Sequence, residues 1–398
     1  MFEALRERNF ALYWTALVFY VLGHRAEYVT FAWIVWELTQ SPMVLGYLGL
    51  AQGIPLLVFQ LVGGVVADRV DRRRLLIATQ LLTGLTLTGT IALTVAGFAD
   101  VRLLLALAAV TNTFRAFDEP TRLAMVPQLV DRAQLPNAIA LGSIPWQAGR
   151  MIGPSITGIV IAAFGSAVGF AIAAGSSWIA LALYGRMRLR PEPSTHVRTH
   201  VVGEFVEGLA YVGGSFVFAT LIGMALLNSI FGMSYLALLP IFADWYFQAG
   251  STGYGLLNAA HGVGALVGTL TIATVASRIR HRGVALLVGG ACVGVALVAF
   301  AVSPWMGLSL GLLLIVGFCN TFYLTQINTI LQEDVPNHLR GRVMSIFSLC
   351  WNLMPLGGLV GGALAAAVDA RFAVLLGGGV VAATALLLLT SPRLRAIR

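Results

Sequence analysis

Long apolar segments follow one another along almost the whole chain, and short polar stretches separate them. A helix needs about 20 apolar residues to cross the hydrocarbon core of a bilayer. Segments of this kind begin near twelve positions: Asn9, Met43, Leu75, Leu103, Asn137, Ala167, Phe216, Thr252, Gly283, Trp305, Val343 and Phe372. The pattern therefore predicts an all-α membrane protein with twelve transmembrane helices. The first segment is too long for a signal-peptide core and lacks a small-residue cleavage site, so we expect it to remain as a membrane helix.

The longest polar connection separates the first six apolar segments from the last six, and Pro191 and Pro193 lie near its start. Later in this connection, apolar side chains share one helical face opposite Glu204 and Glu207, which predicts an amphipathic helix on a membrane surface. That face holds Val201, Val202, Phe205, Val206, Leu209 and Ala210. We therefore expect an N-terminal half over residues 1–187, a linker with an amphipathic helix over 188–214, and a C-terminal half over 215–398.

The two expected halves repeat each other at an offset of 209 residues. Three short matches keep this register: Ala67-Asp68-Arg69 with Ala276-Ser277-Arg278, Val126-Pro127 with Val335-Pro336, and the pair Gly149 and Gly153 with Gly358 and Gly362. Matches at equivalent places in two six-helix segments indicate duplication. The sequence therefore predicts two pseudo-symmetric halves of six helices each.

Composition and charge agree with a membrane protein. The chain is 58% hydrophobic and 11% charged, which excludes an ordinary soluble domain. All 25 basic residues are arginines, and they concentrate in alternate connections between apolar segments. By the positive-inside rule, both termini and the central linker are cytoplasmic in a multi-pass inner-membrane protein. Because topology explains the net charge of +8, we expect no nucleic-acid partner.

Signatures of catalysis or metal binding do not stand out in the sequence. The three cysteines lie far apart within apolar segments, without the spacing of a metal site. The chain has no HExxH motif and no phosphate-binding glycine loop. We therefore expect no metal, no cofactor and no enzymatic activity.

One polar connection carries a distinctive motif. Gly64 stands four residues before Asp68-Arg69, and Arg72 and Arg73 follow. This order resembles the loop between helices 2 and 3 of the major facilitator superfamily of secondary transporters. The resemblance implies a substrate site between the two halves, alternating access, and a cytoplasmic gate. The gate would consist of Asp68, Arg69, Arg72 and Arg73 with Arg115 and Arg122 of the fourth helix.

Further segments resemble one branch of that superfamily. They include Arg8-Asn9-Phe10, Ala116-Phe-Asp-Glu-Pro120 and Arg340-Gly-Arg342-Val343. Together they are similar to the drug/proton antiporters called transmembrane secretion effectors, which include macrolide efflux proteins and enterobactin exporters. The fifth helix also resembles an antiporter signature, which favours export over import. The signature residues are Gly149, Arg150, Gly153, Pro154 and Gly158; the glycines allow another helix to approach closely, and the proline bends its own helix.

Ionisable residues inside the membrane are candidates for function because burying a charge there is costly. The first helix carries His24, Arg25 and Glu27, and the fourth carries Asp118 near its end. We expect these four residues to carry the coupled proton. Two alternatives stay open for Glu27, a fixed ion pair with Arg25 or Arg150 and direct contact with a charged substrate. Asp118 lies one turn from Arg115, so these two residues are candidates to pair with each other or with the loop that holds Asp68.

The resemblance also implies that helices 1, 4, 7 and 10 line the substrate cavity. Candidate lining residues are Asn112, Asn228, Phe231, Tyr235, Asn320 and Tyr323. Their mixed aromatic and amide character suits a bulky amphiphilic substrate, although helix packing explains the aromatic residues equally well. For His261 we favour a neutral histidine with a hydrogen-bonding neighbour over a proton relay.

The leading hypothesis is a monomeric, proton-coupled exporter of small amphiphilic compounds, drug-like or siderophore-like. Its partners would be the small-molecule substrate, protons and membrane lipids. A lipid or lysolipid translocator of the same fold is the first alternative. A membrane scaffold or sensor that transports nothing is the second, and an intramembrane enzyme comes last.

Overall fold

The computed structural model describes residues 3–188, 201–275 and 281–397, and all regular elements in these ranges are helical. Several residues singled out from the sequence lie outside this description. They are Pro191, Pro193, Ala276, Ser277 and Arg278, together with the side chains of Val201, Val202, Glu204 and Phe205. The contacts among the remaining residues divide the chain into two compact units.

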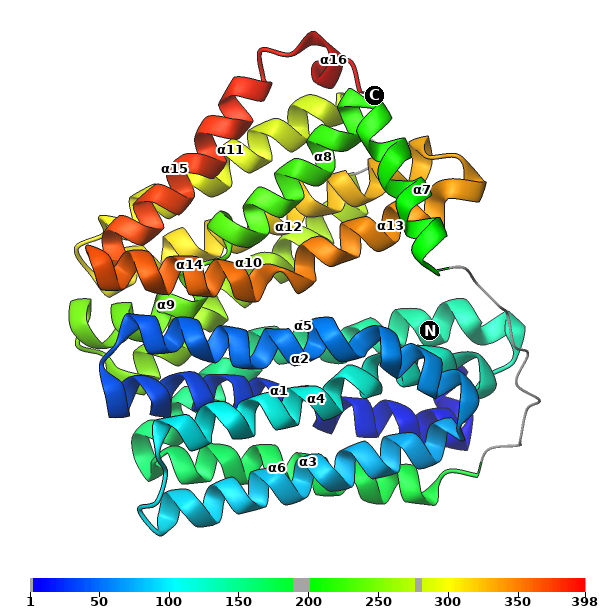
Figure 1. Ribbon diagram of the computed structural model, residues 1–398, viewed down its shortest axis with the longest axis vertical. Helices are drawn as coiled ribbons and strands as arrows, with labels where there is room; N and C mark the ends of the chain where they lie inside the picture. Colours follow the sequence, from blue (N-terminus) through cyan, green and yellow to red (C-terminus); the bar gives the residue numbers. More distant parts are fainter. Residues whose placement is uncertain (1–2, 189–200, 276–280, 398) are drawn as a thin grey trace. The chain divides into compact units, whose positions relative to one another are not determined.

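The first unit comprises Met1–Gln40, Leu50–His196 and Ala249–Ala259. Its helices are α1 (Arg8–Thr39), most of α2 (Pro42–Arg69), α3 (Arg72–Val95), α4 (Val101–Met125), α5 (Leu135–Phe164), α6 (Ser166–Arg186) and the start of α10. Helix α1 packs against α5 and α6, and α3 packs against α4 and α6, with α3 and α6 side by side in Figure 1. The side chains at the centre of this unit therefore come mainly from α1 and from the helices packed against it, α5 and α6.

The second unit comprises Ser41–Gly49, Val197–Gln248 and Ala260–Arg398. Its helices are α7 (Val201–Gly214), α8 (Phe216–Leu227), α9 (Tyr235–Ile241), most of α10 (Gly250–Val275), α11 (Arg282–Ala301), α12 (Met306–Asp334), α13 (Asn337–Asn352), α14 (Met354–Ala367), α15 (Ala370–Leu388) and α16 (Pro392–Arg395). Helix α11 packs against both α12 and α15. Short π-helical segments, η4 (Asn228–Gly232) and η5 (Phe242–Tyr246), flank α9.

Two long apolar segments of the second unit are interrupted rather than continuous helices. In Phe216–Tyr246, π-helical turns replace regular α-helix on both sides of α9. In Asn337–Ala367, α13 ends at Asn352 and α14 begins two residues later, with Pro355 in its first turn. Proline lacks the N–H that would continue the preceding helix, which accounts for this break.

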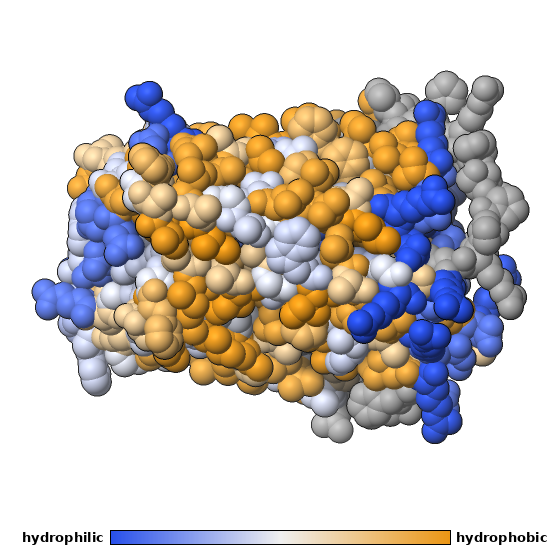
Figure 2. Space-filling model, turned by 90° about the horizontal axis from the view of Figure 1, so that it is seen from below, coloured by the Kyte–Doolittle hydropathy of each residue, from blue (hydrophilic) through white to orange (hydrophobic). Residues whose placement is uncertain are grey.

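Nine of the helical segments in the described ranges are long and apolar enough to cross a membrane. Helices α1, α4 and α5 are not among the nine, although they are 32, 25 and 30 residues long. These three helices carry His24, Arg25, Glu27, Arg115, Asp118 and Arg150, which lower their hydropathy. The face shown in Figure 2 is apolar over a broad band, with hydrophilic side chains at both ends and the densest group of them at one end.

Helix α7 is the amphipathic element expected from the linker sequence, and one of its faces packs on α13. Glu207 pairs with Arg342 at an Oε1–Nη1 distance of 2.5 Å, and Val212 is buried in the core. Gly208 lies directly over Arg342. The apolar side chains of Val206 and Leu209 are exposed, which suits contact with lipid.

Candidate functional site

A buried ion pair joins α1 to α4 in the first unit. Glu27 is only 2% exposed, and its Oε2 lies 2.5 Å from Nη2 of Arg115. Nη1 of the same arginine donates a hydrogen bond to Oδ1 of Asn112 at 2.9 Å. The sequence suggested Arg25 or Arg150 as the ion-pair partner of Glu27. That suggestion is wrong, because the partner is Arg115. Oε1 of Glu27 is buried without a hydrogen-bond partner among the described residues.

A second buried acid, Asp118, links α4 to α3. It accepts hydrogen bonds from the hydroxyl of Thr79 and from Nε2 of Gln80, the latter at 2.7 Å. Its charge partner is Arg122, at 3.5 Å, rather than Arg115, so the pairing suggested by the sequence does not form. The Arg122 guanidinium also lies 3.6 Å from the ring centroid of Tyr20 on α1. Asp118 therefore belongs to a network that connects α1, α3 and α4.

The side chains of His24 and Arg25 occupy different surroundings from Glu27. His24 packs against the rings of Tyr20 and Trp146, and its Nδ1 is buried without a partner among the described residues. Nε of Arg25 is likewise buried and without a partner. Neither Arg25 nor Arg150 forms an ion pair with an acid in the part of the chain that the structure describes. The α1–α5 contact thus holds positive charge without a neighbouring carboxylate in ion-pair distance.

The glycines of the antiporter signature on α5 allow other helices to approach. A Cβ placed on Gly153 would lie 2.7 Å from Cβ of Arg25, and one on Gly149 would collide with Val21. Farther along, Gly158 faces the start of α10, where a Cβ on Gly255 would lie 2.5 Å from the carbonyl oxygen of Pro154. The hydroxyl of Thr157, which stands between Pro154 and Gly158, donates to the Gly153 carbonyl oxygen at 2.8 Å. Its hydrogen bond is therefore satisfied within α5.

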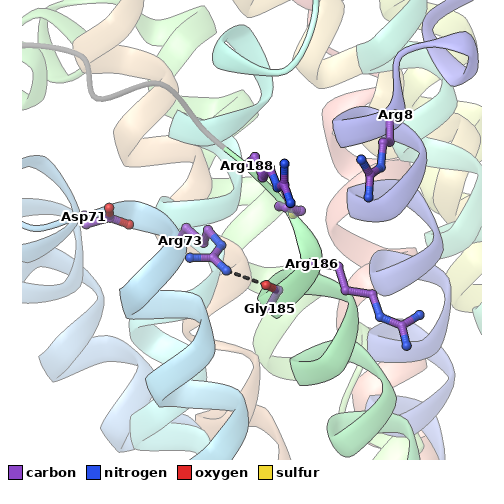
Figure 3. Close-up of a pocket in the computed structure, with 7 residues that line it drawn as sticks. Arg8, Asp71, Arg73, Gly185, Arg186 and Arg188 are labelled. Carbon is purple, nitrogen blue, oxygen red and sulfur yellow. Dashed lines mark hydrogen bonds between the residues drawn. The ribbon is translucent and has the colours of Figure 1, made fainter.

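The charged residues of the polar loop between α2 and α3 differ in their contacts. Asp68 is 70% exposed at its side chain and pairs with Arg72 at 3.5 Å, while Arg72 also donates to the carbonyl oxygen of Ala124 at 3.0 Å. Arg73 donates to the carbonyl oxygens of Tyr184 and Gly185 at the end of α6, and Figure 3 shows the bond to Gly185. Arg69 is exposed. Arg72 and Arg73 therefore anchor the loop to α4 and α6 within this unit.

The close helix crossing next to this loop depends on Gly63 rather than on Gly64. A Cβ on Gly63 would lie 2.5 Å from the carbonyl oxygen of Ala116 on α4, whereas one on Gly64 would meet no atom within 4 Å. The motif spacing had singled out Gly64. The two residues point about 100° apart on α2, and only one of these directions faces α4.

In the second unit, contacts divide the candidate cavity residues into separate groups. Nδ2 of Asn228 donates to Oδ1 of Asn320 at 2.9 Å, and both residues are buried. The Tyr235 hydroxyl lies 2.8 Å from Nδ1 of His261, which is the kind of neighbour expected for this histidine. Tyr323 is fully buried in the apolar core, whereas Phe231 is half-buried.

Four residues of the buried networks were not among the sequence candidates: Tyr20, Thr79, Gln80 and Trp146. Gln80 offers a signal in hindsight, because a glutamine in an apolar helix needs hydrogen-bond partners. The aromatic residues offer no such signal, since their spacing is that of ordinary packing residues.

Curated proteins of similar sequence include an efflux pump and two siderophore transporters. The chain is 30% identical over 355 residues to the multidrug efflux pump Tap of Mycolicibacterium fortuitum, covering 86% of each chain. It is 24% identical to the staphyloferrin A transporter of Staphylococcus aureus, covering 85% of each. It is also 26% identical to the enterobactin exporter EntS of Escherichia coli, covering 78% of this chain and 74% of that protein.

Solved transporter structures share the fold. A single-residue mutant of the nucleoside transporter NupG superposes with a TM-score of 0.77 at 15% identity, covering 96% of this chain and 99% of the other. A bacterial homologue of the lysosomal transporter Spinster gives a TM-score of 0.72 at 15% identity, covering 98% and 96%. The transmembrane secretion effector family matches residues 1–397. The chain is therefore a multi-pass membrane protein that belongs to the transmembrane secretion effectors, a family of major facilitator transporters rather than enzymes.

Proposed function

We propose that this protein is a proton-coupled secondary transporter that exports small amphiphilic compounds by alternating access. The observation that carries the proposal is the buried carboxylate of Glu27, with one oxygen on Arg115 and the other without a partner among the described residues. An intramembrane acid of this kind is a functional candidate because its charge is costly unless paired.

The proposed architecture has twelve membrane helices in two halves, residues 1–187 and 215–398, joined by the linker 188–214. Both termini and the linker would be cytoplasmic. A pair of glycine contacts supports the duplication. Gly255 of α10 lies against Pro154 of α5, and Gly46 of α2 lies against Gly362 of α14. Gly46 and Gly255 are 209 residues apart, as are Gly153 and Gly362, which is the offset of the sequence repeat.

The relatives support the direction of transport and the broad class of substrate. Their names specify multidrug efflux, a staphyloferrin A transporter and an enterobactin exporter. These names specify different substrates, so we propose only a broad class, small amphiphilic compounds. Asn112, with Asn228, Asn320 and the half-buried Phe231 of the second unit, would contact such a substrate. The transporter would act as a monomer.

Proton coupling would work through the partner of Glu27. While Glu27 is ionised, its attraction to Arg115 holds α1 close to α4. When Glu27 takes a proton, this attraction is lost, and Arg115 retains Asn112 as its hydrogen-bond acceptor. The α1–α4 contact would then be weaker, which gives one helix pair two states that protons can bias. Asp118 and the Asp68–Arg72 loop would form the gate that responds to this change.

The decisive experiment uses Glu27→Gln in proteoliposomes. The glutamine mimics the protonated acid, so we expect substrate to exchange down its gradient while uphill export driven by a proton gradient disappears. Glu37→Gln is the matched control, because Glu37 lies on the same helix but is exposed. A folded Glu27→Gln protein that still pumps uphill would contradict the proposal and direct attention to Asp118 or His24.

Two other functions remain as outcomes of the same assay. A lipid translocator of this fold would move fluorescent lysolipid between leaflets while ignoring dyes and siderophores. A scaffold or sensor would show no flux with any compound and no effect of Glu27→Gln. The family and its relatives favour the exporter.

A further inference from the structure

Four arginines surround a cavity at one end of the first unit. The cavity has a volume of about 500 Å³ and is lined by Arg8, Asp71, Arg73, Gly185, Arg186, Met187 and Arg188. Figure 3 shows the contributing elements, with Arg8 at the start of α1, Arg73 at the start of α3, and Arg186 and Arg188 at the end of α6. Three segments far apart in the sequence thus bring positive charge to one place.

Hydrogen bonds fix the walls of this cavity. Asn9 and Arg188 form two reciprocal bonds, in which Nδ2 of Asn9 donates to the Arg188 carbonyl oxygen at 2.9 Å and the Arg188 N–H donates to Oδ1 of Asn9 at 3.1 Å. These bonds tie the end of α6 to the start of α1. Arg73 donates to the carbonyl oxygens of Tyr184 and Gly185, which ties α3 to the same end of α6.

Among the described residues, no ion pair neutralises the positive charge of the cavity. None of its four arginines forms an ion pair with an acid in the described ranges. The single acid in the lining, Asp71, accepts a hydrogen bond from the N–H of Arg74 at 2.8 Å and so caps α3. The cavity therefore has an excess of three positive charges, which favours an anionic ligand.

Arginine is well suited to phosphate, because its planar guanidinium presents several N–H donors in a fixed geometry. Phosphate could come from free inorganic phosphate or from a lipid headgroup, and the surface next to the cavity favours the lipid. Ile179 on α6 is an exposed apolar side chain, and it lies seven residues before Arg186, close to two helical turns, so the two residues share one face of α6. Seven residues span about 10 Å along the helix, which is within the depth of one bilayer leaflet.

We propose that this cavity binds the phosphate headgroup of an anionic phospholipid, with the acyl chains lying along α6. Basic pockets between helices at a membrane surface recognise such headgroups. The site does not include Glu27 or Asp118, but it shares Asp71 and Arg73 with the loop between α2 and α3. Lipid binding there does not depend on the proposed proton coupling. Bound lipid would join α1, α3 and α6 at the end where their arginines repel one another.

Native mass spectrometry of the purified full chain tests this proposal with phosphatidylglycerol, phosphatidylcholine and inorganic phosphate as separate probes. We expect phosphatidylglycerol to be retained in preference to phosphatidylcholine. The double variant Arg186→Gln/Arg188→Gln should weaken that retention by about 10- to 30-fold, since each arginine near a membrane surface contributes about fivefold. The control double variant Arg132→Gln/Arg395→Gln removes two exposed arginines that do not line the cavity and should change retention less than about twofold.

Three results would overturn the proposal. Equal retention of phosphatidylcholine would show that the negative charge is not recognised. If both double variants lost the same retention of phosphatidylglycerol, the lipid would respond to the net charge of the protein and not to this cavity. Inorganic phosphate that binds and is not displaced by phosphatidylglycerol would assign the cavity to the free anion. If the first double variant does not fold, the exposed Arg8→Gln supplies the same comparison, with an expected loss of about fivefold.

Discussion

Arg115 and Glu27 are 88 residues apart in sequence, yet their side chains meet at 2.5 Å in a buried ion pair between α4 and α1. Both side chains are largely removed from solvent, at 12% and 2% exposure. In such surroundings each charge depends on the other, because removing one leaves the second buried without compensation. The pair thus contributes to holding the two helices together and is placed to respond to protonation.

Removing Arg115 alone should destabilise the protein. In Arg115→Gln, the ionised Glu27 loses its charge partner, and we expect the free energy of unfolding to fall by about 3 to 5 kcal/mol. Adding Glu27→Gln removes the unpaired charge, so the double variant should recover most of that loss. Thermal unfolding in detergent would measure both effects.

Arg102→Gln is the control for the comparison of Arg115→Gln with the double variant, because Arg102 is exposed at the start of the same helix. We expect it to change the free energy of unfolding by less than about 0.5 kcal/mol. A double variant no more stable than Arg115→Gln would show that the two residues act independently and that Glu27 has another partner.

The sequence allowed the helical class and the charged candidates to be identified, but not their partners. Apolar length is a local property, so long helices follow directly from it. Ion-pair partners depend on which helices are neighbours and how each is rotated. The sequence suggested Arg25 or Arg150 for Glu27 because they lie on the same helix or in a familiar motif. The partner is Arg115, on a helix whose packing against α1 is a tertiary property.

The same limit applies to Asp118. Arg115 lies three residues before it and Arg122 four residues after it, and both spacings allow contact on a helix. The structure selects Arg122, because Arg115 reaches across to Glu27. Thr79 and Gln80 complete the surroundings of Asp118 from α3. Their role could be recognised only once α3 and α4 were known to be adjacent.

Gln80 should be important for the Asp118 network. In Gln80→Leu, the carboxylate loses a donor at 2.7 Å in a buried site, and we expect a loss of about 1 to 3 kcal/mol in the free energy of unfolding. Thr86→Val is the control, since the hydroxyl of the half-buried Thr86 donates to the Leu82 carbonyl oxygen of its own helix at 2.8 Å and contacts no acid. Chemical or thermal unfolding in detergent would compare the stability of the two variants. If both variants lose the same free energy of unfolding, Thr79 and Arg122 alone provide the hydrogen bonds and charge that Asp118 needs.

Asp68→Asn should change conformational populations more than stability. The Asp68–Arg72 pair is exposed, so its loss should cost at most about 1 kcal/mol of stability. If Asp68 belongs to the gate, the same change should shift the protein toward the cytoplasm-open state by about 5- to 150-fold, the usual range of allosteric coupling. Spin-label distances on the cytoplasmic side would report the shift. Distance distributions identical to those of the control Asp100→Asn would remove Asp68 from the gate.

Neighbouring glycines on α2 give the sharpest test of helix packing. In Gly63→Ala, the new Cβ would lie 2.5 Å from the carbonyl oxygen of Ala116, a backbone atom that can move only with α4. We therefore expect Gly63→Ala to destabilise the protein by about 1 to 3 kcal/mol through overpacking. In Gly64→Ala, the Cβ meets no atom within 4 Å, and alanine favours a helix over glycine by about 0.5 to 1 kcal/mol. The two variants should therefore shift the unfolding temperature in opposite directions in the same assay. A stable Gly63→Ala protein with full transport would contradict the close crossing of α2 and α4, and destabilisation by Gly64→Ala would mean that the glycine in the motif has a contact of its own.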